Sequence, residues 1–596
     1  MRRFLYSRKK NLDVKPENFI EVSFEVANKV GGIYQVLNSK SSKMKDYYDG
    51  SYITVGRYDE EEVRDDFNPS KCPKEVEELK KQNLEGIEVH CGSWMISGQP
   101  TCILVDPSGM EKSADEVKEE MYEEHGVDSL GAGEEFNGPV KWSYAAGKVI
   151  SVLEDEMEGE TVVQLHEWLS GPAILNFDSP SVFTTHATAL GRVLSNSDYD
   201  LQKAVERGEV DDELAPEYGV KAKHQVEKMA AHQASVFTTV SKTTAHEAEA
   251  VLDREPDKIL PNGFNVEEFP SLEELSYQHK QKKKKMKEFL RAYFEPYYDI
   301  NLENDPRILF ISGRYEFHNK GLDIFIDALG KLNERKGDDF FVFIFVPSDV
   351  KGAKPEVLEN MSLYQELENY VEDLNPRIRT SLLNSLTSNG NPGEELKEVI
   401  DQTSQTIESL QRKFHSKGES PPTSAYDLTY AGDEILDLLY RNGLQNKEEN
   451  RVKVIFYPTY LSRGDKLLSM DYNDAIVGSS AGIFPSYYEP WGYTPVETAA
   501  NGALSITTDM TGFGRFLYDN TEDDDRKGIR VLDRKDIPNS EATENLAEMV
   551  EDIVSYSKTE ITERKHNARK LAQLTSWEKL GENYKEAHEM ALENGR

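Results

Sequence analysis

Short runs of β-branched and aromatic residues alternate along the whole chain with longer stretches of helical periodicity. Runs of this kind are typical of buried strands in parallel sheets, and the helical stretches supply the crossovers between them. In the first half, the expected strands are FIEVSFEV (19–26), YITVGRY (52–58), TVVQLHEW (161–168), VFTTHA (182–187), VFTTVS (236–241) and KILPNG (258–263). In the second half, they are RILFISGRY (307–315), FFVFIFVP (340–347), RVKVIFYP (451–458), GIFPS (482–486), LSITTD (504–509) and GIRVLD (528–533). Two such sets predict an α/β protein with two doubly wound, Rossmann-like domains.

The chain has 596 residues, which is too many for one compact domain. The first domain is expected to cover residues 1–263 and the second 264–574, with a last helix at 575–596. A lysine run at 280–287 opens the second domain. One face of lysines on a helix is well solvated, so this interpretation is favoured over a polymer-binding patch.

Residues 355–445 interrupt the second domain with helical periodicity and no strand pattern. Apolar residues step by three and four along two segments, close to the seven-residue repeat of a coiled coil. They are Val357, Met361, Tyr364, Leu367, Val371, Leu374 and Ile378, then Leu396, Ile400, Ile407 and Leu410, with NGNPG (389–393) between the segments. A projecting helical hairpin predicts an oligomerisation arm. A helical layer packed on its own domain is the alternative, and Pro376 argues against one continuous helix.

Acidic residues outnumber basic ones by 108 to 70, which gives a formal net charge of -38. Such a field repels nucleic acid phosphates and anionic lipid, so neither is an expected partner. The acids are spread along the chain and form no long block. This distribution favours a surface adapted to high salt, as in a halophile, over an acidic tail.

Three cysteines (Cys72, Cys91 and Cys102) are too few for a disulfide framework and fit no zinc spacing, which favours a reducing cytoplasm. The basic start of the chain precedes no apolar stretch of signal-peptide length. The longest apolar run, FFVFIFV at 340–346, is far shorter than a membrane span. A cytoplasmic protein without membrane insertion is therefore expected.

A lysine and a glycine pair, Lys29, Gly31 and Gly32, follow the first expected strand and precede an amphipathic helix. Backbone amides at such a helix N-terminus can approach a phosphate or a sugar closely, because glycine has no side chain. A tight turn would explain the glycines equally well.

Two histidines stand at the carboxyl ends of expected parallel strands, the edge at which open α/β sheets bind their ligands. His166 ends one strand, His186 ends the next, and Arg192 lies six residues later on the following helix. If both histidines face one crevice, they can contact a substrate while Arg192 contacts an anion. Two hydrogen-bonded structural histidines are the alternative.

The segment SGRYEFHNKG (312–321) places Arg314 at the end of a strand and Lys320 at the mouth of the next helix. Two cations on one loop are suited to neutralising a leaving diphosphate, because they stabilise the charge that develops as the sugar bond breaks. An ordinary charged surface loop is the alternative.

The segment FPSYYEPWGYTPVETAANG (484–502) is dense in aromatic residues, proline and glycine. Glu489 lies on its rigid loop and can contact a sugar, while Glu497 lies on the following helix and can accept hydrogen bonds from ribose hydroxyls. Gly492, Tyr493 and Thr494 offer backbone amides to a phosphate at that helix N-terminus. Such a composition is unfavourable for a regular helix or strand, so a rigid packed turn is the alternative interpretation.

Together these segments resemble the glycogen synthases of the animal and fungal type, which are retaining glycosyltransferases with the two-Rossmann GT-B fold. The similar motifs stand in the family's order: EVANKVGGIYQVL (25–37), HEWLSGPAI (166–174), FTTHATALGR (183–192), VFTTVSKTTAHEAE (236–249), LPNGFNV (260–266), GRYEFHNKG (313–321) and FPSYYEPWGYTP (484–495). The resemblance spans about residues 17 to 590. Val30 before the glycine pair matches this type, whereas the bacterial and plant starch-synthase type has threonine there.

The resemblance implies transfer of glucose from a nucleotide sugar to the non-reducing 4-hydroxyl of an α-1,4-glucan, with the anomeric configuration retained. The donor would be UDP-glucose or ADP-glucose, with UDP-glucose favoured, and the acceptor glycogen or a maltooligosaccharide. Two domains facing a cleft would perform the transfer without a metal or other cofactor. The last helix, with Trp577 and Tyr584, would cross back to the first domain.

The family's site residues carry over to individual positions of this chain. Arg314 and Lys320 would bind the diphosphate and stabilise its departure, and Glu497 would hold the ribose. Glu489 would be the acid next to the glucose. His186 and Asn262 would line the donor sugar, and Tyr472 would stack on the base.

The chain departs from the family at its regulatory elements. Animal and fungal members sense glucose 6-phosphate through an arginine-dense helix and carry long phosphorylated tails. The corresponding stretch here keeps only Arg564, Lys565, Arg569 and Lys570, so neither kind of control is expected. The insertion at 355–445 matches the region through which the family forms tetramers, which implies a homo-oligomer. The excess of acid then predicts a member from a halophilic archaeon.

Two other functions fit the same motifs. One is a transferase of the same fold with a small sugar or sugar phosphate as acceptor, as in sucrose-type or trehalose-type synthases. The other is a glucan-binding paralogue without catalytic activity, although all the candidate catalytic residues are present. A phosphorylase would require a lysine that anchors pyridoxal phosphate.

Overall fold

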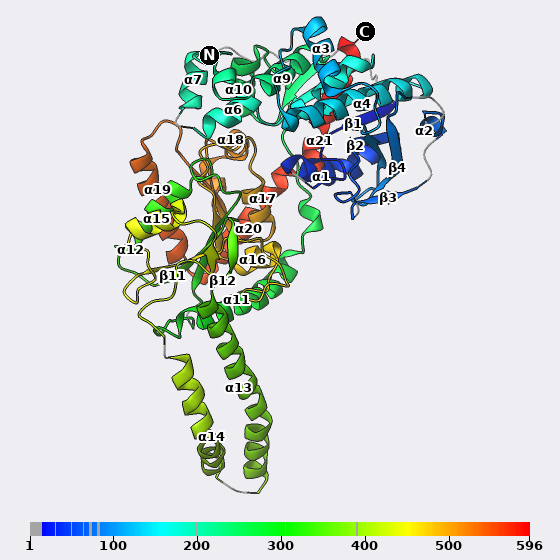
Figure 1. Cartoon of the computed structure of the whole chain (residues 1–596). Coiled ribbons are helices and arrows are strands. Elements are labelled where there is room, and N and C mark those ends of the chain that lie inside the picture. The colour runs from blue at the N-terminus through cyan, green and yellow to red at the C-terminus, as the bar shows by residue number, and fades with distance from the viewer. Residues whose placement is uncertain are drawn as a thin grey trace. The chain divides into compact units, whose positions relative to one another are not determined.

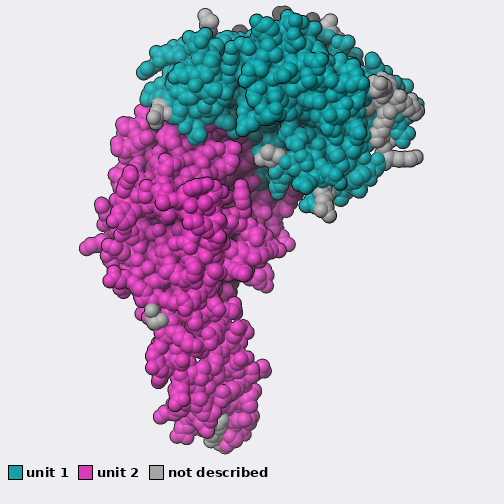
Figure 2. Space-filling model, viewed as in Figure 1, with its two compact units in different colours: residues 1–266, 511–516, 573–596 teal, residues 267–510, 517–572 magenta. Residues whose placement is uncertain are grey.

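The computed structural model describes residues 15–29, 31–48, 51–63, 65–70, 74–79, 84–197, 199–303, 305–388, 391–415 and 417–595. The chain forms two compact units (Figure 2). Unit 1 comprises residues 1–266, 511–516 and 573–596, and unit 2 comprises residues 267–510 and 517–572. The main segment of unit 1 thus ends next to the boundary expected at residue 263, and the last helix of the chain belongs to unit 1.

Unit 1 is built on a nine-stranded sheet with the order β3-β4-β5-β2-β1-β6-β7-β8-β9. Its strands are β1 (Asn18–Val22), β2 (Tyr52–Arg57), β3 (Phe67–Pro69), β4 (Glu88–Trp94), β5 (Thr101–Asp106), β6 (Thr161–His166), β7 (Ser181–Thr185), β8 (Val236–Thr239) and β9 (Lys258–Ile259). The β3–β4 and β4–β5 pairs are antiparallel, and the other neighbours are parallel. Strands β2 to β5 all lie on one side of β1 and strands β6 to β9 on the other, so the strand order reverses between β1 and β6.

The helices of unit 1 cover both faces of this sheet. They are α1 (Gly32–Tyr47), α2 (Lys74–Leu79), α3 (Ala114–His125), α4 (Glu134–Glu156), α5 (Glu167–Ser170), η1 (Gly171–Asn176), α6 (Ala189–Ser195), α7 (Leu201–Arg207), α8 (Leu214–Glu217), α9 (Lys221–Gln233), α10 (Lys242–Leu252), η4 (Gln573–Thr575) and α21 (Trp577–Asn594). The last helix, α21, packs on α1 and on β6 to β9 (Figure 1). Two further elements, η2 (Val266–Glu268) and α18 (Gly512–Asn520), contain the points at which the chain passes between units.

Several strands of unit 1, including β1, β6 and β9, end earlier than the sequence predicts, and two of them end at sharp turns. The first was expected to continue to residue 26, but β1 ends at Val22 because the chain turns there. The amide of Val26 donates to the carbonyl of Ser23 (3.2 Å), and Ala27 has a φ of 56°. Likewise β6 ends at His166, because Glu167 has a φ of 65° and begins α5. Both turns place polar side chains at the edge where the strand order reverses.

Unit 2 is built on a six-stranded, fully parallel sheet with the order β14-β11-β10-β15-β16-β17. Its strands are β10 (Arg307–Ser312), β11 (Phe340–Phe345), β14 (Val452–Phe456), β15 (Ala481–Ile483), β16 (Leu504–Thr508) and β17 (Ile529–Leu532). All six lie where the sequence predicts them. The strand order reverses between β10 and β15.

The central strand β11 shows why this sheet is buried on both faces. Phe340, Val342 and Ile344 belong to one apolar cluster, with α12 and α19. The alternate residues Phe341, Phe343 and Phe345 belong to the other cluster, with α11. Successive strand residues point to opposite faces, so a continuous apolar run requires helices on both sides. The helices are α11 (Leu272–Phe294), α12 (Leu322–Asn333), α15 (Glu434–Arg441), α16 (Tyr472–Gly478), α17 (Tyr493–Ala500), η3 (Asp523–Asp525), α19 (Asn539–Ser555) and α20 (Lys558–Ala572).

Two long helices, α13 (Pro355–Thr387) and α14 (Pro392–Phe414), lie side by side and extend away from the sheet of unit 2 (Figure 1). The helix α13 continues through Pro376, against the expectation of a break. The ends of the pair nearest the sheet are buried at Val357 and Leu410, whereas apolar side chains further along are exposed. The exposed ones include Val371, Leu383, Leu386, Ile400 and Ile407.

The expectation that residues 355–445 contain no strand is wrong. The short strand β13 (Tyr426–Leu428) pairs antiparallel with β12 (Val350–Ala353). Three residues are too few to show the alternation that marks a strand in a sequence. This small ladder joins the returning end of the helical pair to the segment that leads into it.

The lysine run at 280–287 lies on α11 and is solvated only in part. Lys284 is exposed, and Lys282 pairs with Asp474 (2.6 Å). Lys283, in contrast, is buried and pairs with Asp305 (2.6 Å). The interpretation of the run as a solvated face is therefore wrong for Lys283, which is paired inside unit 2.

The cysteines behave differently from one another. Cys102 is a buried free thiol, whereas Cys91 is disulfide-bonded, which the sequence analysis did not expect. Cys72 lies outside the described residues. Within the part of the chain that the structure describes, no helix has the length and apolar character required to cross a membrane.

Candidate active site

The glycine pair of unit 1 stands at the N-terminus of α1, beside the β1–β6 reversal. Glu25, which the sequence analysis did not single out, occupies this turn: its Oε2 accepts the amide of Tyr34 (2.7 Å). A side chain on Gly31 would place its Cβ 2.4 Å from Glu25 Oε1, whereas a Cβ on Gly32 would meet nothing within 4 Å. Lys29 is exposed, 5.9 Å from the ring of Tyr34. Position 31 thus requires glycine, because any side chain there would collide with the carboxylate of Glu25, whereas the space next to Gly32 is open.

The two candidate histidines meet inside unit 1. His166, at the end of β6, and His186, after β7, are buried, with His166 Nδ1 3.0 Å from His186 Nε2. His166 Nε2 lies 2.8 Å from Oε1 of Glu21 on β1, a residue that the sequence analysis did not single out. The two histidines thus contact each other, and both have the hydrogen bonds that the structural alternative predicts.

A second buried acid, Glu167, supports the backbone after β7. Its Oε1 accepts the amides of His186 (3.1 Å) and Ala187 (3.3 Å). Burial raises the pKa of Glu167 to about 7, although the nearby charge of Arg192 opposes the rise. Arg192 lies exposed on α6 and also opposes the rise that burial causes in the pKa of Glu25. Arg192 is therefore held in an acidic environment at the surface of unit 1.

Asn262 presents a hydrogen-bond acceptor without a partner. The residue is buried, and its Oδ1 forms no hydrogen bond to any described residue. The next residue, Gly263, packs against the indole of Trp577 on α21, where a Cβ would lie 2.4 Å from the ring. Buried amide oxygens are rarely left unpaired in folded proteins, so this atom is a candidate to bind a ligand hydroxyl.

In unit 2 the loops after β10 and β15 are joined through backbone contacts. The carbonyl of Asn319 accepts the amide of Tyr487 (2.8 Å), and a Cβ on Gly321 would lie 2.0 Å from the carbonyl oxygen of Pro485. This contact brings Lys320 beside Glu489, and the two side chains form an ion pair. Both are largely shielded from solvent, with exposed fractions of 16% and 22%. The candidate cation and the candidate acid thus lie together at the reversal between β10 and β15.

Arg314 lies apart from that pair. Its side chain is 67% exposed and pairs with Glu316 (2.8 Å) on the same loop. His318, also on this loop, contacts Asp323 through Nδ1 (2.9 Å) and packs against the ring of Tyr487. An exposed arginine at the end of β10 is free to move toward an anion, because only the neighbouring Glu316 pairs with it among the described residues.

Tyr472 on α16 and Glu497 on α17 are near enough in unit 2 for the charge of Glu497 to act on Tyr472. Tyr472, the first residue of α16, exchanges a hydrogen bond with Ser312 at the end of β10 (2.7 Å). Burial, and then the charge of Glu497, raises the pKa of Tyr472. Burial likewise raises the pKa of Glu497 from 4.5 to about 7. An aromatic ring and a carboxylate of this kind can recognise a nucleoside.

The helix that carries Glu497 begins at Tyr493, one residue before the expected Thr494. Gly492 precedes it with a φ of 102°, a conformation that favours glycine. A Cβ there would lie 3.2 Å from Cγ of Glu489, so Gly492 also shapes the loop that holds this acid. Of the expected site residues in unit 2, Lys320 and Glu489 form one group, Tyr472 and Glu497 a second, and Tyr493 and Thr494 open the helix between them.

Replacing Gly321 by alanine is expected to destabilise the Lys320 loop and to lower activity. The new Cβ would collide with Pro485, and Gly321 has a φ of 68°. The matched control is Gly443→Ala, because Gly443 has a φ of 67° with nothing within 4 Å of its Cβ. Activity and urea unfolding of both variants measure the difference. The strain of a positive φ alone costs about 1 kcal/mol, and equal losses in both variants would contradict a role for the collision.

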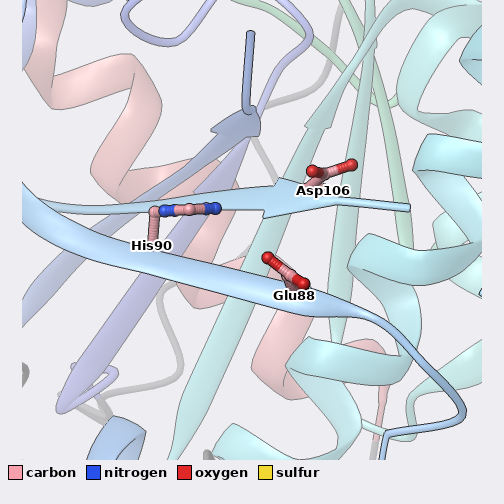
Figure 3. A group of neighbouring side chains, drawn as sticks. All are labelled: Glu88, His90 and Asp106. Carbon is pink, nitrogen blue, oxygen red and sulfur yellow. The ribbon is translucent and has the colours of Figure 1, made fainter. Parts of the chain in front are cut away.

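One group of side chains in the described part of unit 1 has the composition of a metal site. Glu88 and His90 project from β4 and Asp106 from β5, and their ligand atoms lie within 4.8 Å of one another (Figure 3). The ring of His90 stacks on Tyr58, and Asp106 accepts the amide of Ser108 (2.8 Å). The group lies on the β4–β5 ladder, with β2 between it and β1, so we assign it no part in chemistry at the β1–β6 reversal.

Two Rossmann-like units, each with ionisable side chains where its strand order reverses, define a protein of the GT-B fold class. The solved catalytic domain of Starch Synthase IV from Arabidopsis thaliana shares this fold, with a TM-score of 0.54 and 13% identity over 97% of this chain and 99% of that chain. Residues 21–595 match the profile of the Glycogen synthase family. The chain belongs to the glycogen synthase family, as the motifs predicted.

Curated relatives match along most of their length. Glycogen (starch) synthase isoform 2 of Saccharomyces cerevisiae is 33% identical over 618 residues, covering 98% of this chain and 87% of that protein. The liver glycogen (starch) synthase of Mus musculus is 32% identical over 599 residues, covering 98% of this chain and 84% of that protein.

Proposed function

We propose that this enzyme transfers glucose from UDP-glucose to the non-reducing 4-hydroxyl of an α-1,4-glucan, with retention of configuration. The observation that carries the proposal is the Lys320–Glu489 pair at the β10–β15 reversal, on a loop that also presents the exposed cation Arg314. A cation and an acid held together there suit a reaction in which a diphosphate leaves a sugar. Membership of the glycogen synthase family supports a nucleotide sugar as donor and a glucan as acceptor.

In this proposal, unit 2 binds the nucleotide. Tyr472 stacks on the base, and Glu497 accepts hydrogen bonds from the ribose. Lys320 and Arg314 neutralise the diphosphate as the bond to glucose breaks, and the amides of Tyr493 and Thr494 add hydrogen bonds at the N-terminus of α17. These cations take the part that a metal ion plays in other transferases, so no metal or other cofactor is required.

Unit 1 contacts the sugar and the acceptor in the same proposal. His186 and the unpaired Oδ1 of Asn262 bind hydroxyl groups of the donor glucose. Gly31 and Gly32 let the backbone approach the sugar, with Lys29 and Arg192 adding positive charge. His166 acts through His186, as its 3.0 Å contact indicates.

The donor and the acceptor are tested together. Purified protein is assayed with UDP-, ADP- and GDP-glucose as donors and with glycogen, maltooligosaccharides, glucose and glucose 6-phosphate as acceptors. We expect the highest kcat/KM with UDP-glucose and glycogen, and proton NMR of the first product should show an α linkage. Transfer to the monosaccharide or the sugar phosphate alone would favour the small-acceptor alternative, and no transfer at all would favour a glucan-binding paralogue.

The pKa of Glu497 predicts a pH-dependent KM for the donor. Because burial raises this pKa to about 7, the carboxylate that accepts from ribose is present above that pH and is protonated below it. A charged acceptor binds more tightly than a neutral one by about 1 kcal/mol, so KM should rise about three- to fourfold between roughly pH 8 and pH 6. Glu497→Gln should show a high KM at both values, and a wild-type slope in this variant would assign the titration to another group.

The pair of α13 and α14 is proposed to join copies of the chain. Its outer apolar residues, including Leu383 and Leu386, are exposed in the single chain. A homo-oligomer such as a tetramer would cover them. Light scattering of the wild type and of Leu383→Glu/Leu386→Glu tests this, and a wild-type monomer would contradict it.

The net charge of -38 supports an enzyme adapted to high salt, as in a halophilic archaeon. Activity and stability should both increase from millimolar to molar KCl, and indifference to salt would contradict the proposal.

Regulation by a sugar phosphate at α20 is not proposed. Arg564 stacks on Tyr556, and Arg569 donates to the carbonyls of Pro270 and Ala500. Lys565 is close to His279, and Lys570 is exposed.

A further inference from the structure

A chain of three buried groups runs through the sheet of unit 1, from Glu21 on β1 through His166 on β6 to His186 after β7. Glu21 Oε1 lies 2.8 Å from His166 Nε2, and His166 Nδ1 lies 3.0 Å from His186 Nε2. The exposed fractions of Glu21, His166 and His186 are 0%, 1% and 8%. Each contact joins neighbouring strands, β1 with β6 and β6 with the end of β7, so the sheet itself fixes the spacing.

The first group of the chain, Glu21, is held as a carboxylate. It forms an ion pair with Lys40 on α1, and its other oxygen accepts the hydroxyl of Tyr52. Burial alone would raise the pKa of Glu21, but Lys40 and the hydrogen bond from His166 outweigh it and lower the pKa to about 2. An ionised carboxylate can only accept hydrogen bonds, so the His166 nitrogen that faces it carries a proton.

The two histidines are neutral for a related reason. Burial lowers the pKa of His166, with Lys40 contributing and Glu21 opposing. Burial also lowers the pKa of His186, and the nearby charges of Lys40 and Arg192 act in the same direction. A neutral imidazole carries one proton, so it donates through one nitrogen and accepts through the other.

These facts determine the position of both protons. His166 donates from Nε2 to Glu21, so its Nδ1 is an acceptor. His186 must then donate from Nε2 to that acceptor, which leaves Nδ1 of His186 as the nitrogen without a proton. No described residue hydrogen-bonds to this Nδ1, and the atom is not among those fully shielded from solvent.

We infer that Glu21 is a positioning residue that fixes His186 in the Nε2–H tautomer, so that His186 accepts a hydrogen bond from a sugar hydroxyl and cannot donate one. The contact with sugar rests on the proposed function, but the tautomer rests on the chain of contacts alone. Glu21 touches neither the sugar nor the nucleotide in this account, and it acts through His166.

The C-terminal helix α21 completes the arrangement from the other side of Lys40. The ring of Tyr584 lies 4.3 Å from Lys40 Nζ, and Trp577 donates to Ser39 on α1 (2.9 Å). An aromatic face stabilises a buried ammonium, which in turn keeps Glu21 ionised. The hydroxyl of Tyr584 forms no hydrogen bond to any described residue, so the ring is the part of this side chain that acts on Lys40.

The tautomer is measured directly by NMR on deuterated protein with ¹⁵N-labelled histidine. The His186 signals are assigned from their loss in His186→Asn, and long-range ¹H–¹⁵N correlations show which ring nitrogen carries the proton. We expect Nε2–H in the wild type. In His166→Leu, which leaves the Glu21–Lys40 pair in place, the Nδ1–H form should appear. An Nδ1–H signal in the wild type, or an unchanged tautomer in His166→Leu, would overturn the inference.

The control variant is His224→Leu. His224 is also buried in unit 1 and also hydrogen-bonds a carboxylate, Asp212 (3.0 Å), but it lies outside the chain of three. The His224→Leu substitution should leave the NMR signals of His186 unchanged. Because the wild-type spectrum decides the tautomer, the inference stays testable even if His166→Leu fails to fold.

Sugar analogues test the direction of the hydrogen bond. A deoxy-glucose donor lacks the hydroxyl, and a fluoro-glucose donor can accept but not donate. If His186 only accepts, kcat/KM should be about tenfold lower with either analogue of the contacted hydroxyl than with the natural donor. In His166→Leu, this difference between the natural donor and the analogues should become smaller. A fluoro analogue that retains wild-type kcat/KM would show His186 donating and overturn the inference. Absence of any glucosyl transfer by the wild type would refute the proposed function and leave the NMR result standing.

Discussion

Lys320→Ala is expected to lower kcat for glucosyl transfer by about a hundredfold or more, the usual loss when one group that stabilises developing charge is removed. The Lys320 ammonium is the cation held most firmly at the β10–β15 reversal, where it pairs with Glu489. Its partial burial matters, because a charge shielded from water acts more strongly on the leaving diphosphate than an exposed one. Initial rates with saturating UDP-glucose and glycogen measure the effect.

The control for this variant lies in the last turn of α12, the helix that follows the Lys320 loop. Lys331 also forms an ion pair with a glutamate, Glu544, but both side chains are 43% exposed. Lys331→Ala should therefore leave kcat within about twofold, because exposed pairs contribute little. Equal kcat values for the two variants would refute the assignment of Lys320 to the site.

Glu489→Gln separates the two roles that the acid can have. The amide keeps the size of the side chain but removes the charge that pairs with Lys320. If Glu489 only holds Lys320, Glu489→Gln should lower kcat by about tenfold, the cost of one charge-assisted hydrogen bond, and thus by less than Lys320→Ala. If Glu489 also contacts the glucose, the loss of kcat should exceed about tenfold.

The alternation of apolar runs and helical stretches was enough to predict two doubly wound sheets. A strand such as β11 is recognisable because all six of its residues are buried, so none of them interrupts the apolar run. The short strand β13 was missed because Tyr426–Leu428 is stabilised by pairing with β12, which a local pattern does not contain. Tertiary pairing decides such segments, and local composition does not.

The candidate site was predictable where residue types are unusual for their position. Histidines at strand ends and a loop rich in aromatic residues and glycine are rare enough to stand out. The acids Glu21, Glu25 and Glu167 were missed because a single glutamate beside a strand resembles a surface residue in a chain with 108 acidic residues. Only the folded sheet shows that Glu21 faces Lys40 and His166 without access to water.

The same burial predicts the largest stability effect in unit 1. Lys40→Met should lower the free energy of unfolding by about 3–5 kcal/mol, because it leaves Glu21 buried without its cation. Both side chains of this pair are 0% exposed, whereas Lys43 on the same helix pairs with Glu578 at exposed fractions of 44% and 45%. Lys43→Met should therefore cost no more than about 1 kcal/mol.

Two units that unfold separately would obscure a global measurement, so the two variants are best compared by hydrogen exchange of the amides in β1 and α1. Exchange there should accelerate strongly in Lys40→Met and little in Lys43→Met. The double variant Glu21→Gln/Lys40→Met should recover part of the loss, because removing both partners leaves no uncompensated charge. If the single and double variants exchanged equally fast, the cost would come from lost packing against Tyr584 rather than from the buried charge, and the account of Glu21 as an ionised group held by Lys40 would fail.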